Sequence, residues 1–378
     1  MKQHRKNLLM KKRITVFADY QIFSLQKFGG ISRVFTELYR QFSISKKVKF
    51  KIPILFSENE NIQLVKKTRN PLKKCSSFLK KLFYYGFNRI YSVLYLIFGK
   101  YDVFHPTYYD PYFLPFLRKK PFVLTVHDFT HERYPKGVSK IDKTISWKKK
   151  LLFRADKIIA ISESTKRDII EFYNIDKEKI DVVLQATSLE LTKKNLNLDI
   201  PKRYILFVGN RAGYKNFIFF FKSIVPLLKE DKDLYVLCAG SNVFTDEEIN
   251  TFKEYNIEHR VIHWRFKGDE ELSYLYNHAL CFVFPSLYEG FGIPVLESLG
   301  CECPAVISNV SSLPEVGGDA CEYFDPNSNN SIRKAIEGVI YDENKRKEMI
   351  LKGKERTKVF SWEKTAKAYA VIYKSLTK

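Results

Sequence analysis

Two carboxylates and two glycines lie close together in residues 285–297, which read PSLYEGFGIPVLE. An apolar run at 279–284 precedes them and predicts a buried strand. Pro294 suits the start of a helix, because proline lacks the N–H that would have no partner there. Gly290 and Gly292 let the backbone approach a ligand and point N–H groups at it. The stretch therefore predicts an anion site at a helix N-terminus.

The acids tell more about the ligand than the glycines do. Glu289 lies in the turn itself, where a carboxylate would repel a phosphate unless it accepts hydrogen bonds from hydroxyl groups. Hydroxyls beside a diphosphate indicate a nucleotide sugar. Glu297, expected in the first helical turn, either binds hydroxyls as well or only complements the positive end of the helix dipole.

A second strand-to-helix turn of this kind spans 208–216, with the sequence VGNRAGYKN. Gly209 and Gly213 free its backbone, while Arg211 and Lys215 supply two cations. Cations at the carboxyl end of a strand can neutralise a diphosphate leaving group. The alternative is a surface turn with two solvated charges.

The first half of the chain offers weaker candidates. Asp19 ends the first expected strand, and Gly29-Gly30 leads into the first expected helix; such a glycine pair can also simply shape a loop. His127, followed by Asp128, ends another expected strand. A histidine there either has a structural role or binds a ligand at the mouth of a cleft. No cluster of residues has the spacing of a metal site, and no nucleophile motif stands out.

Both halves alternate short apolar strands with amphipathic helices, which is typical of parallel α/β sheets. We expect strands at 14–18, 48–55, 103–105, 122–126, 157–161 and 180–184, and again at 204–208, 234–239, 260–263, 279–284, 305–308 and 320–323. The longer helices are expected at 31–42, 77–98, 139–154, 164–173, 216–229, 246–255, 269–277, 294–299, 331–341, 343–358 and 362–376. A chain of 378 residues is long enough for two domains. Residues 1–190 and 202–359 are the expected domains, with a ligand cleft between them at the carboxyl ends of the strands.

The positive charge is concentrated in the first half. Residues 1–200 hold 40 lysines and arginines against 18 acids, whereas residues 201–378 hold 24 of each. This asymmetry favours an anionic partner for the first half, such as a membrane surface, a phosphorylated lipid or a nucleic acid. The alternative is a general enrichment in lysine, which the neutral second half argues against.

One segment could contact a membrane. Residues 78–98 are rich in Phe and Tyr and are flanked by Lys73, Lys74, Lys80, Lys81 and Lys100. Asn88 and Arg89 at its centre argue against a membrane span. The helix either lies on a membrane surface or is buried with a basic rim, and the sequence leaves both open. Six cysteines without zinc-type pairing and the absence of a signal peptide in residues 1–13 favour a reduced, cytoplasmic protein.

The spacing Glu289-x7-Glu297 within S-x-Y-E-G-F-G-I-P-V-L-E resembles the hallmark of retaining glycosyltransferases of the GT-B fold, in particular glycosyltransferase family 4. Other parts of the chain are similar to the family as well: Gly29-Gly30, His127-Asp128, the basic turn at 208–216, and the segments 313–318, 324–326 and 360–362. The resemblance implies two Rossmann-like domains with parallel sheets that face an interdomain cleft. It also implies that the final helix, within 360–378, crosses back to the first domain.

The resemblance also implies roles for individual residues. Glu289 would contact hydroxyls of the donor sugar, and Glu297 the ribose of the nucleotide. Lys215 and Arg211 would hold the diphosphate, with help from the turn that includes Gly209. Further donor contacts would come from the backbone of Gly290, Phe291 and Gly292, with His127 beside the transferred sugar and Asp19, Gly29 and Gly30 on the acceptor side. The chain departs from the family at Asn210, where many members have an arginine, and this makes Lys215 a safer assignment than Arg211.

The implied activity is that of a retaining hexosyltransferase that uses a GDP- or UDP-linked sugar, with no metal and no other cofactor. The acceptor would be a lipid-linked or anionic glycan of surface polysaccharide or lipopolysaccharide biosynthesis. The basic first domain would hold this acceptor, and the protein would lie peripherally at the cytoplasmic face of the plasma membrane. No nucleic acid is expected as a partner. Two other functions are possible on the same fold: a non-catalytic membrane or nucleic-acid-binding protein, and a nucleotide-sugar 2-epimerase.

Overall fold

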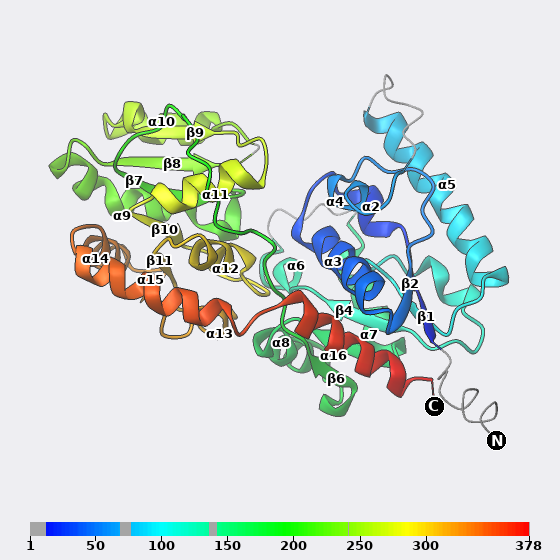
Figure 1. Ribbon diagram of the computed structural model, residues 1–378. Coiled ribbons are helices and arrows are strands. Elements are labelled where there is room, and N and C mark those ends of the chain that lie inside the picture. Colours follow the sequence, from blue (N-terminus) through cyan, green and yellow to red (C-terminus); the bar gives the residue numbers. More distant parts are fainter. Residues whose placement is uncertain (1–12, 69–76, 136–141, 241, 378) are drawn as a thin grey trace. The chain divides into compact units, whose positions relative to one another are not determined.

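The computed structural model describes residues 13–68, 77–135, 142–240 and 242–377, without the side chains of 77–81. Most of the basic N-terminal segment and the lysines at 73 and 74 therefore lie outside the described residues. The chain forms two compact units, which are considered one at a time (Figure 1). The first contains residues 1–132, 138–185 and 362–378, and the second contains 133–137 and 186–361.

The first unit contains two three-stranded parallel sheets, with strand orders β2-β1-β3 and β4-β5-β6. A single parallel bridge between Phe104 and Phe122 links β3 to the start of β4, so the two sheets follow each other side by side. The strands are β1 Ile14–Ala18, β2 Val48–Lys51, β3 Val103–His105, β4 Val123–Val126, β5 Lys157–Ala160 and β6 Ile180–Val182.

Helices connect these strands as expected for crossover connections. The long ones are α3 Gly30–Ser45, α5 Ser77–Phe98, α7 Thr144–Arg154 and α8 Glu163–Tyr173. The short ones are α2 Gln21–Leu25, α4 Glu60–Gln63, η1 Pro111–Phe116, α6 Thr130–Arg133 and η2 Lys177–Lys179.

The second unit is built on one six-stranded parallel sheet of order β12-β11-β10-β7-β8-β9. Alternate residues of β7 face opposite sides of this sheet. Ile205 and Phe207 belong to the core under α9 and α14. On the other side, the Tyr204 hydroxyl donates a hydrogen bond to the Leu275 carbonyl of α11. The strands are β7 Tyr204–Val208, β8 Tyr235–Ala239, β9 Val261–Trp264, β10 Cys281–Phe284, β11 Ala305–Ser308 and β12 Cys321–Phe324.

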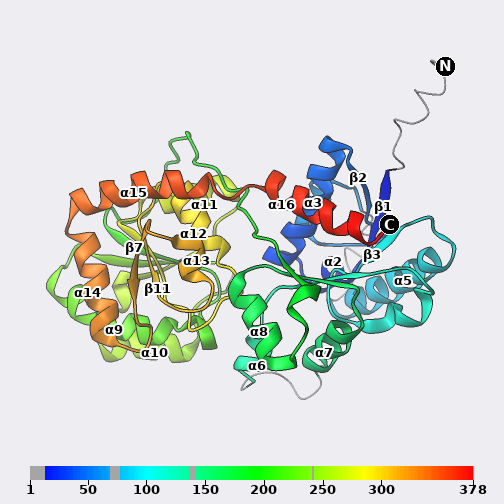
Figure 2. The ribbon, with the colours of Figure 1, turned by 90° about the horizontal axis from the view of Figure 1, so that it is seen from below.

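The helices of the second unit cover both faces of this sheet (Figure 2). They are α9 Phe217–Glu230, α10 Asp246–Glu254, α11 Asp269–His278, α12 Ile293–Gly300, α13 Leu313–Gly317, α14 Asn329–Ile340 and α15 Glu343–Thr357, with the short η3 Gly213–Lys215 and η4 Glu258–Arg260.

The last helix, α16 Trp362–Ser375, belongs to the first unit and packs against α3 and β1 (Figures 1 and 2). Two of its buried tyrosines reach polar groups of that unit. The Tyr373 hydroxyl lies 2.7 Å from His105 Nδ1, and the Tyr369 hydroxyl lies 3.2 Å from Thr125 Oγ1. The prediction that the chain returns to its first domain is confirmed.

The expected elements are present, and their ends differ by a few residues. The largest error is at β2, which was expected to continue to residue 55 but ends at Lys51. Pro53 has no N–H for a ladder, and the backbone N–H groups of Leu55 and Phe56 donate to Asn88 Oδ1 of α5 instead. Part of the helix expected at 139–154 falls outside the described residues, and α7 begins at Thr144. Of the helices that the structure describes, none has both the length and the apolar character needed to cross a bilayer.

We expect Tyr373→Phe to lower the free energy of unfolding by about 1–3 kcal/mol, because it leaves a buried His105 nitrogen without a partner. Val371→Ala is the matched control on the same helix, where the side chain is 67% exposed, and it should change stability by less than about 0.5 kcal/mol. Urea unfolding followed by circular dichroism measures both. Equal midpoints for Tyr373→Phe and wild type would show that this bond does not secure α16.

Candidate functional site

The two glycine-bearing turns predicted from the sequence follow β7 and β10, which are neighbours in the sheet of the second unit. Ile205 pairs with Cys281 and Leu206 with Phe282 in parallel register, so both strands end at the same edge. From β7 the chain continues to β8 on one side, while β10 lies on the other. The order of strands therefore reverses between them, and such a switch point is where open α/β sheets bind ligands.

The turns also contact each other directly. The backbone N–H of Leu287, in the turn after β10, donates to the Tyr214 carbonyl in the turn after β7, at 2.8 Å. The structure thus brings together two segments that are more than seventy residues apart in the sequence.

Gly292 fixes the geometry of the turn at the start of α12. Its φ is +107°, a conformation that side-chain-bearing residues rarely adopt, and a Cβ there would lie 2.8 Å from Leu313 Cδ2. Gly292 is the N-cap of α12, and Pro294 lies in the first turn. The predicted glycine turn at a helix N-terminus is therefore confirmed, whereas its ligand stays a prediction.

Two serines hold this turn and were missed from the sequence. Ser311 Oγ accepts the Glu289 backbone N–H at 2.9 Å, and Ser312 Oγ lies 2.9 Å from both the Glu289 and the Phe291 carbonyls. Both follow β11, the next strand along the sheet. The only signal for them was a serine pair just after an expected strand.

Lys215 and Glu289 form an ion pair at this edge of the sheet. Lys215 Nζ lies 2.6 Å from Glu289 Oε1, and the two side chains are 18% and 12% exposed. The pair is therefore partly accessible to solvent and is not sealed in the core. The lysine would also offset the repulsion between Glu289 and a phosphate, were one to bind beside it.

Aromatic rings position the lysine. Its Nζ lies 5.0 Å from the centre of the Tyr214 ring and 5.1 Å from that of Phe284, the last residue of β10. Lys215 ends the short η3 segment, which begins at Gly213 with a φ of +57°. The glycine thus makes the tight turn that carries the lysine back toward β10.

Glu297 lies on α12 and is almost fully buried. Its Oε2 lies 3.3 Å from the hydroxyl of Tyr276 on α11, a partner that the sequence did not suggest. The prediction that Glu297 lies in the first helical turn is wrong, since α12 begins at Ile293 and has no acid in its first turn. An effect on the helix N-terminus is correspondingly weaker, because helix-dipole effects fade beyond the first turn.

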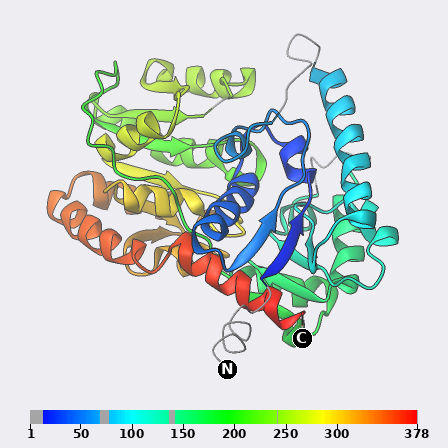
Figure 3. The same cartoon turned by 45° about the vertical axis from the view of Figure 1, so that its right-hand side comes forward.

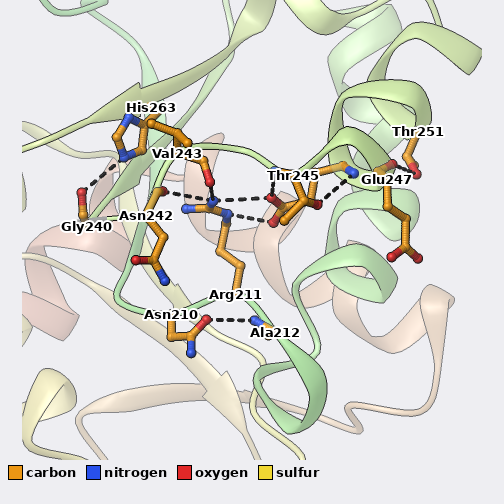
Figure 4. A network of polar contacts seen from close by, with 11 residues as sticks. Asn210, Arg211, Ala212, Gly240, Asn242, Val243, Thr245, Glu247, Thr251 and His263 are labelled. Carbon is orange, nitrogen blue, oxygen red and sulfur yellow. Dashed lines mark hydrogen bonds and ion pairs between the residues drawn. The ribbon is translucent and has the colours of Figure 1, made fainter. Parts of the chain in front are cut away.

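Arg211 does not join Lys215 and Glu289. Its guanidinium pairs with Glu248 of α10, at 2.6 Å from Nε to Oε1, and donates to the carbonyls of Asn242 and Val243 (Figure 4). Glu248 also closes the capping box of α10 with Thr245. Burial would raise the pKa of Glu248, but the hydrogen bonds from Arg211 and Thr245 lower it below its usual value. These contacts favour a structural role, and the assignment of Arg211 to the diphosphate stays an untested prediction.

Next to Arg211, Gly209 has a φ of +109°, and a Cβ there would meet open space. Its carbonyl closely faces Gly240, where a Cβ would lie 3.0 Å from the Gly209 oxygen. The two loops after β7 and β8 therefore approach through glycine backbone. The Asn210 side chain accepts the Ala212 N–H at 3.1 Å and shapes the turn locally (Figure 4).

In the first unit, Asp19 is the centre of a buried hydrogen-bond network. Its Oδ1 accepts from the backbone and hydroxyl of Thr107 at 2.8 and 2.7 Å, and its Oδ2 accepts from Gln21 Nε2 and the Tyr112 hydroxyl at 2.8 and 3.1 Å. Burial raises its pKa, although these hydrogen bonds oppose the shift. The network ties the end of β1 to the segment after β3, so Asp19 shapes this edge of the sheet.

Gly29 and Gly30 lie where the sequence placed them, at the start of α3. Gly29 is its N-cap, and the Gly29 carbonyl accepts from Ser32 Oγ at 2.9 Å and from Asn61 Nδ2 at 3.1 Å. A Cβ at Gly29 would overlap the Gln26 side chain. Gly30 is exposed.

His127 lies directly after β4 and is buried. Its backbone N–H donates to the Tyr109 hydroxyl at 3.1 Å. Burial lowers the pKa of the imidazole to about 4, the neighbouring Asp128 opposes the shift, and Lys148 adds to it. His127 is therefore neutral at pH 7 and can exchange hydrogen bonds with a ligand without adding a charge. In the parts of the chain that are described, no group of three His, Cys, Asp or Glu side chains could hold a metal ion.

Known proteins similar to this chain bear on the meaning of this site. Residues 189–356 match the family described as Glycosyl transferases group 1, and residues 28–190 match Glycosyltransferase Family 4. The chain belongs to glycosyltransferase family 4. It is 30% identical over 291 residues to O-antigen chain mannosyltransferase B of Escherichia coli, which covers 72% of this chain and 74% of that protein.

Other relatives of this family 4 chain agree in sequence and in fold. It is 26% identical over 229 residues to O-antigen chain mannosyltransferase RfbU of Salmonella typhimurium, with 60% of this chain and 62% of that protein covered. The solved structure of HepE from Anabaena with UDP and glucose has a TM-score of 0.73 at 16% identity and covers 96% of this chain and 100% of that chain. The predicted GT-B fold is confirmed.

The family 4 chain is thus a glycosyltransferase, as predicted. These relatives give no support to the two other functions considered from the sequence, a non-catalytic binding protein and a nucleotide-sugar 2-epimerase.

The buried His127 predicts a pH dependence of stability. Its pKa is about 4 in the folded protein against 6.5 for an ordinary histidine, so between these values the unfolded chain binds a proton that the folded chain does not. The free energy of unfolding should therefore fall as the pH drops from 6.5 to 4, by about 1.4 kcal/mol per pH unit for this residue. Burial also lowers the pKa of His105, to about 3, so this second histidine adds a slope of its own over the same range. We expect His127→Gln to reduce the measured slope by the share of His127, whereas His259→Gln, at an exposed histidine, should leave it unchanged. Urea unfolding at several pH values tests this, and an unchanged slope in His127→Gln would contradict the assigned pKa.

Proposed function

We propose that this family 4 glycosyltransferase moves a hexose, with retention of anomeric configuration, from a GDP- or UDP-linked sugar to a lipid-linked or otherwise anionic glycan in surface polysaccharide biosynthesis. The Lys215–Glu289 pair at the sheet's switch point carries the proposal. Two relatives named as O-antigen mannosyltransferases support the pathway and make mannose the first donor sugar to try.

The donor site follows from the charges around this pair. A diphosphate carries more negative charge than the Glu289 carboxylate, so it would compete for Lys215 Nζ. The backbone N–H groups of Phe291 and Gly292 at the start of α12 would add to its stabilisation. Glu289 would then be free to accept hydrogen bonds from the hydroxyls of the sugar, and Glu297 would accept them from the ribose.

In the proposed reaction the bond between the anomeric carbon and the diphosphate oxygen breaks, and an acceptor oxygen forms a bond to that carbon on the same face. The proton of the acceptor hydroxyl passes to the departing phosphate oxygen. Positive charge develops on the sugar and negative charge on the leaving group, so Lys215 stabilises the transition state more than the ground state. The neutral His127 would contact the transferred sugar without opposing the positive charge on it. The proposal needs no metal and no other cofactor.

The acceptor would be held by the first unit, with Asp19, Gly29 and Gly30 on the acceptor side. The excess of lysine and arginine in residues 1–200 supports an anionic acceptor and a peripheral position at the cytoplasmic face of the membrane.

We expect a screen of GDP- and UDP-sugars by thermal shift to find one donor that raises the melting temperature, because a ligand at about 100 times its Kd stabilises the folded state by about 2.7 kcal/mol. With that donor, Lys215→Ala should lower the turnover number by about 100- to 1000-fold, as expected when a group that stabilises the developing charge is lost.

The control is Lys334→Ala, which removes an exposed lysine on α14 in the same unit and should retain wild-type turnover. Circular dichroism shows whether each variant is folded. Normal turnover in a folded Lys215→Ala protein would overturn the proposed phosphate role.

A further inference from the structure

Helix α5 exposes a row of large apolar side chains, although its buried face includes polar ones. The side chains that face the first unit repeat every four residues and include two polar ones, Asn88 and Ser92, both fully buried. On the outside are large apolar side chains that are 47% to 78% exposed: Leu82, Phe87, Ile90, Leu94 and Phe98. An ordinary surface helix instead has charged and polar side chains on its outer face.

The buried face of α5 is held by hydrogen bonds to the rest of the first unit. Asn88 Oδ1 accepts the N–H groups of Leu55 and Phe56, and its Nδ2 donates to Ser24 Oγ and the Phe56 carbonyl, so all four of its hydrogen-bonding positions are occupied. The Ser92 hydroxyl lies 2.6 Å from that of Tyr112. The helix is therefore fixed in its rotation, and the apolar side chains cannot turn inward.

The outer face is long and mostly apolar among the side chains that are described, with Arg89, 45% exposed, beside it. The exposed residues cover one side of α5 from Leu82 to Phe98, four to five turns of helix. Arg89, the charged residue between them, leans toward the unit and pairs with Asp110 at 3.2 Å. Figures 1 and 3 show α5 along the outer edge of the first unit, with the rest of that unit on one side of it.

The surroundings of this face are basic. Residues 77–120 contain seven lysines and arginines and two acids. Both acids have partners within the protein: Asp102 accepts the Thr15 N–H at 2.8 Å, and Asp110 forms an ion pair with Arg89. Exposed cations lie beyond the C-terminal end of the helix, at Lys100, Arg118, Lys119 and Lys120, and Lys120 Nζ lies 5.7 Å from the Tyr101 ring.

From this geometry we infer that the outer face of α5 is the surface by which the protein binds an anionic lipid bilayer. The apolar side chains enter the boundary between headgroups and acyl chains, the helix lies parallel to the membrane plane, and the basic end contacts anionic headgroups. This deepens the proposed function, on which it rests, because a lipid-linked acceptor would have to be met at such a surface. Under this inference the two expectations for residues 78–98 both apply, since one face of the helix is buried and the other would be available to lipid.

Flotation with vesicles tests the inference. Wild type should float with vesicles of phosphatidylcholine and phosphatidylglycerol, and less with phosphatidylcholine alone or at high salt. Ile90→Glu/Leu94→Glu should reduce the partition coefficient by at least about tenfold, since it places charge where apolar contact is needed. The milder Ile90→Ser/Leu94→Ser serves if the first variant does not fold.

The matched control is Val371→Glu, which introduces the same charge at an exposed valine on α16 of the same unit, and it should float like wild type. Wild-type flotation of a folded α5 variant would overturn the inference. So would a wild-type dimer that the α5 substitutions dissociate, because the face would then bind a second copy of the chain.

Donor binding by thermal shift separates this inference from the proposed function. If the α5 variants lose vesicle binding but keep the donor shift, both stand. If no nucleotide sugar stabilises wild type while vesicle binding depends on α5, the proposed function fails and the membrane surface remains. If the donor shift is present and vesicle binding ignores α5, only the surface is wrong.

Discussion

The ion pair between Lys215 and Glu289 is the interaction on which the rest of the site depends. It exists only because β7 and β10, separated by two strands and three α-helices in the sequence, are neighbours in the sheet. Each turn contributes one charge, and each needs glycine to reach the other: Gly213 on the lysine side and Gly292 on the glutamate side. The strand order thus brings the two turns together, and the pairing of Lys215 with Glu289 follows from it.

In the proposed donor site, this pair would allow one small region to bind both a diphosphate and sugar hydroxyls. A lone carboxylate would repel the phosphate, and a lone lysine would leave the hydroxyls without an acceptor. Together they form a nearly neutral ion pair, from which a phosphate could take the lysine and leave the carboxylate to the sugar hydroxyls. Ser311 and Ser312 would keep the backbone of Glu289 in place when a donor binds, because they contact both sides of the turn.

The sequence was sufficient to predict what depends on local pattern. Strands such as Ile14–Ala18 and Tyr204–Val208 are apolar runs bounded by turns, and the Gly292–Pro294 helix start has a local signature. What depends on distant partners was not predictable. Arg211 and Lys215 look alike within one turn, yet Arg211 pairs with Glu248 and Lys215 with Glu289. The hydrogen-bond partners of Asp19 and the Tyr276 partner of Glu297 likewise lie on segments distant in the sequence. For α5 the spacing of apolar residues was visible, but only the contacts of Asn88 show which face is buried.

Isothermal titration calorimetry of the donor and of its nucleoside diphosphate is the most direct test of the account. Lys215→Ala should weaken both ligands by the same factor, because both carry the diphosphate. Glu289→Gln should weaken the nucleotide sugar and leave the nucleoside diphosphate unchanged or slightly tighter, because only the sugar needs the carboxylate. If Glu289→Gln weakens the binding of both ligands equally, or if Lys215→Ala weakens the binding of neither, then Lys215 does not bind the diphosphate while Glu289 binds the sugar, which contradicts the proposed site.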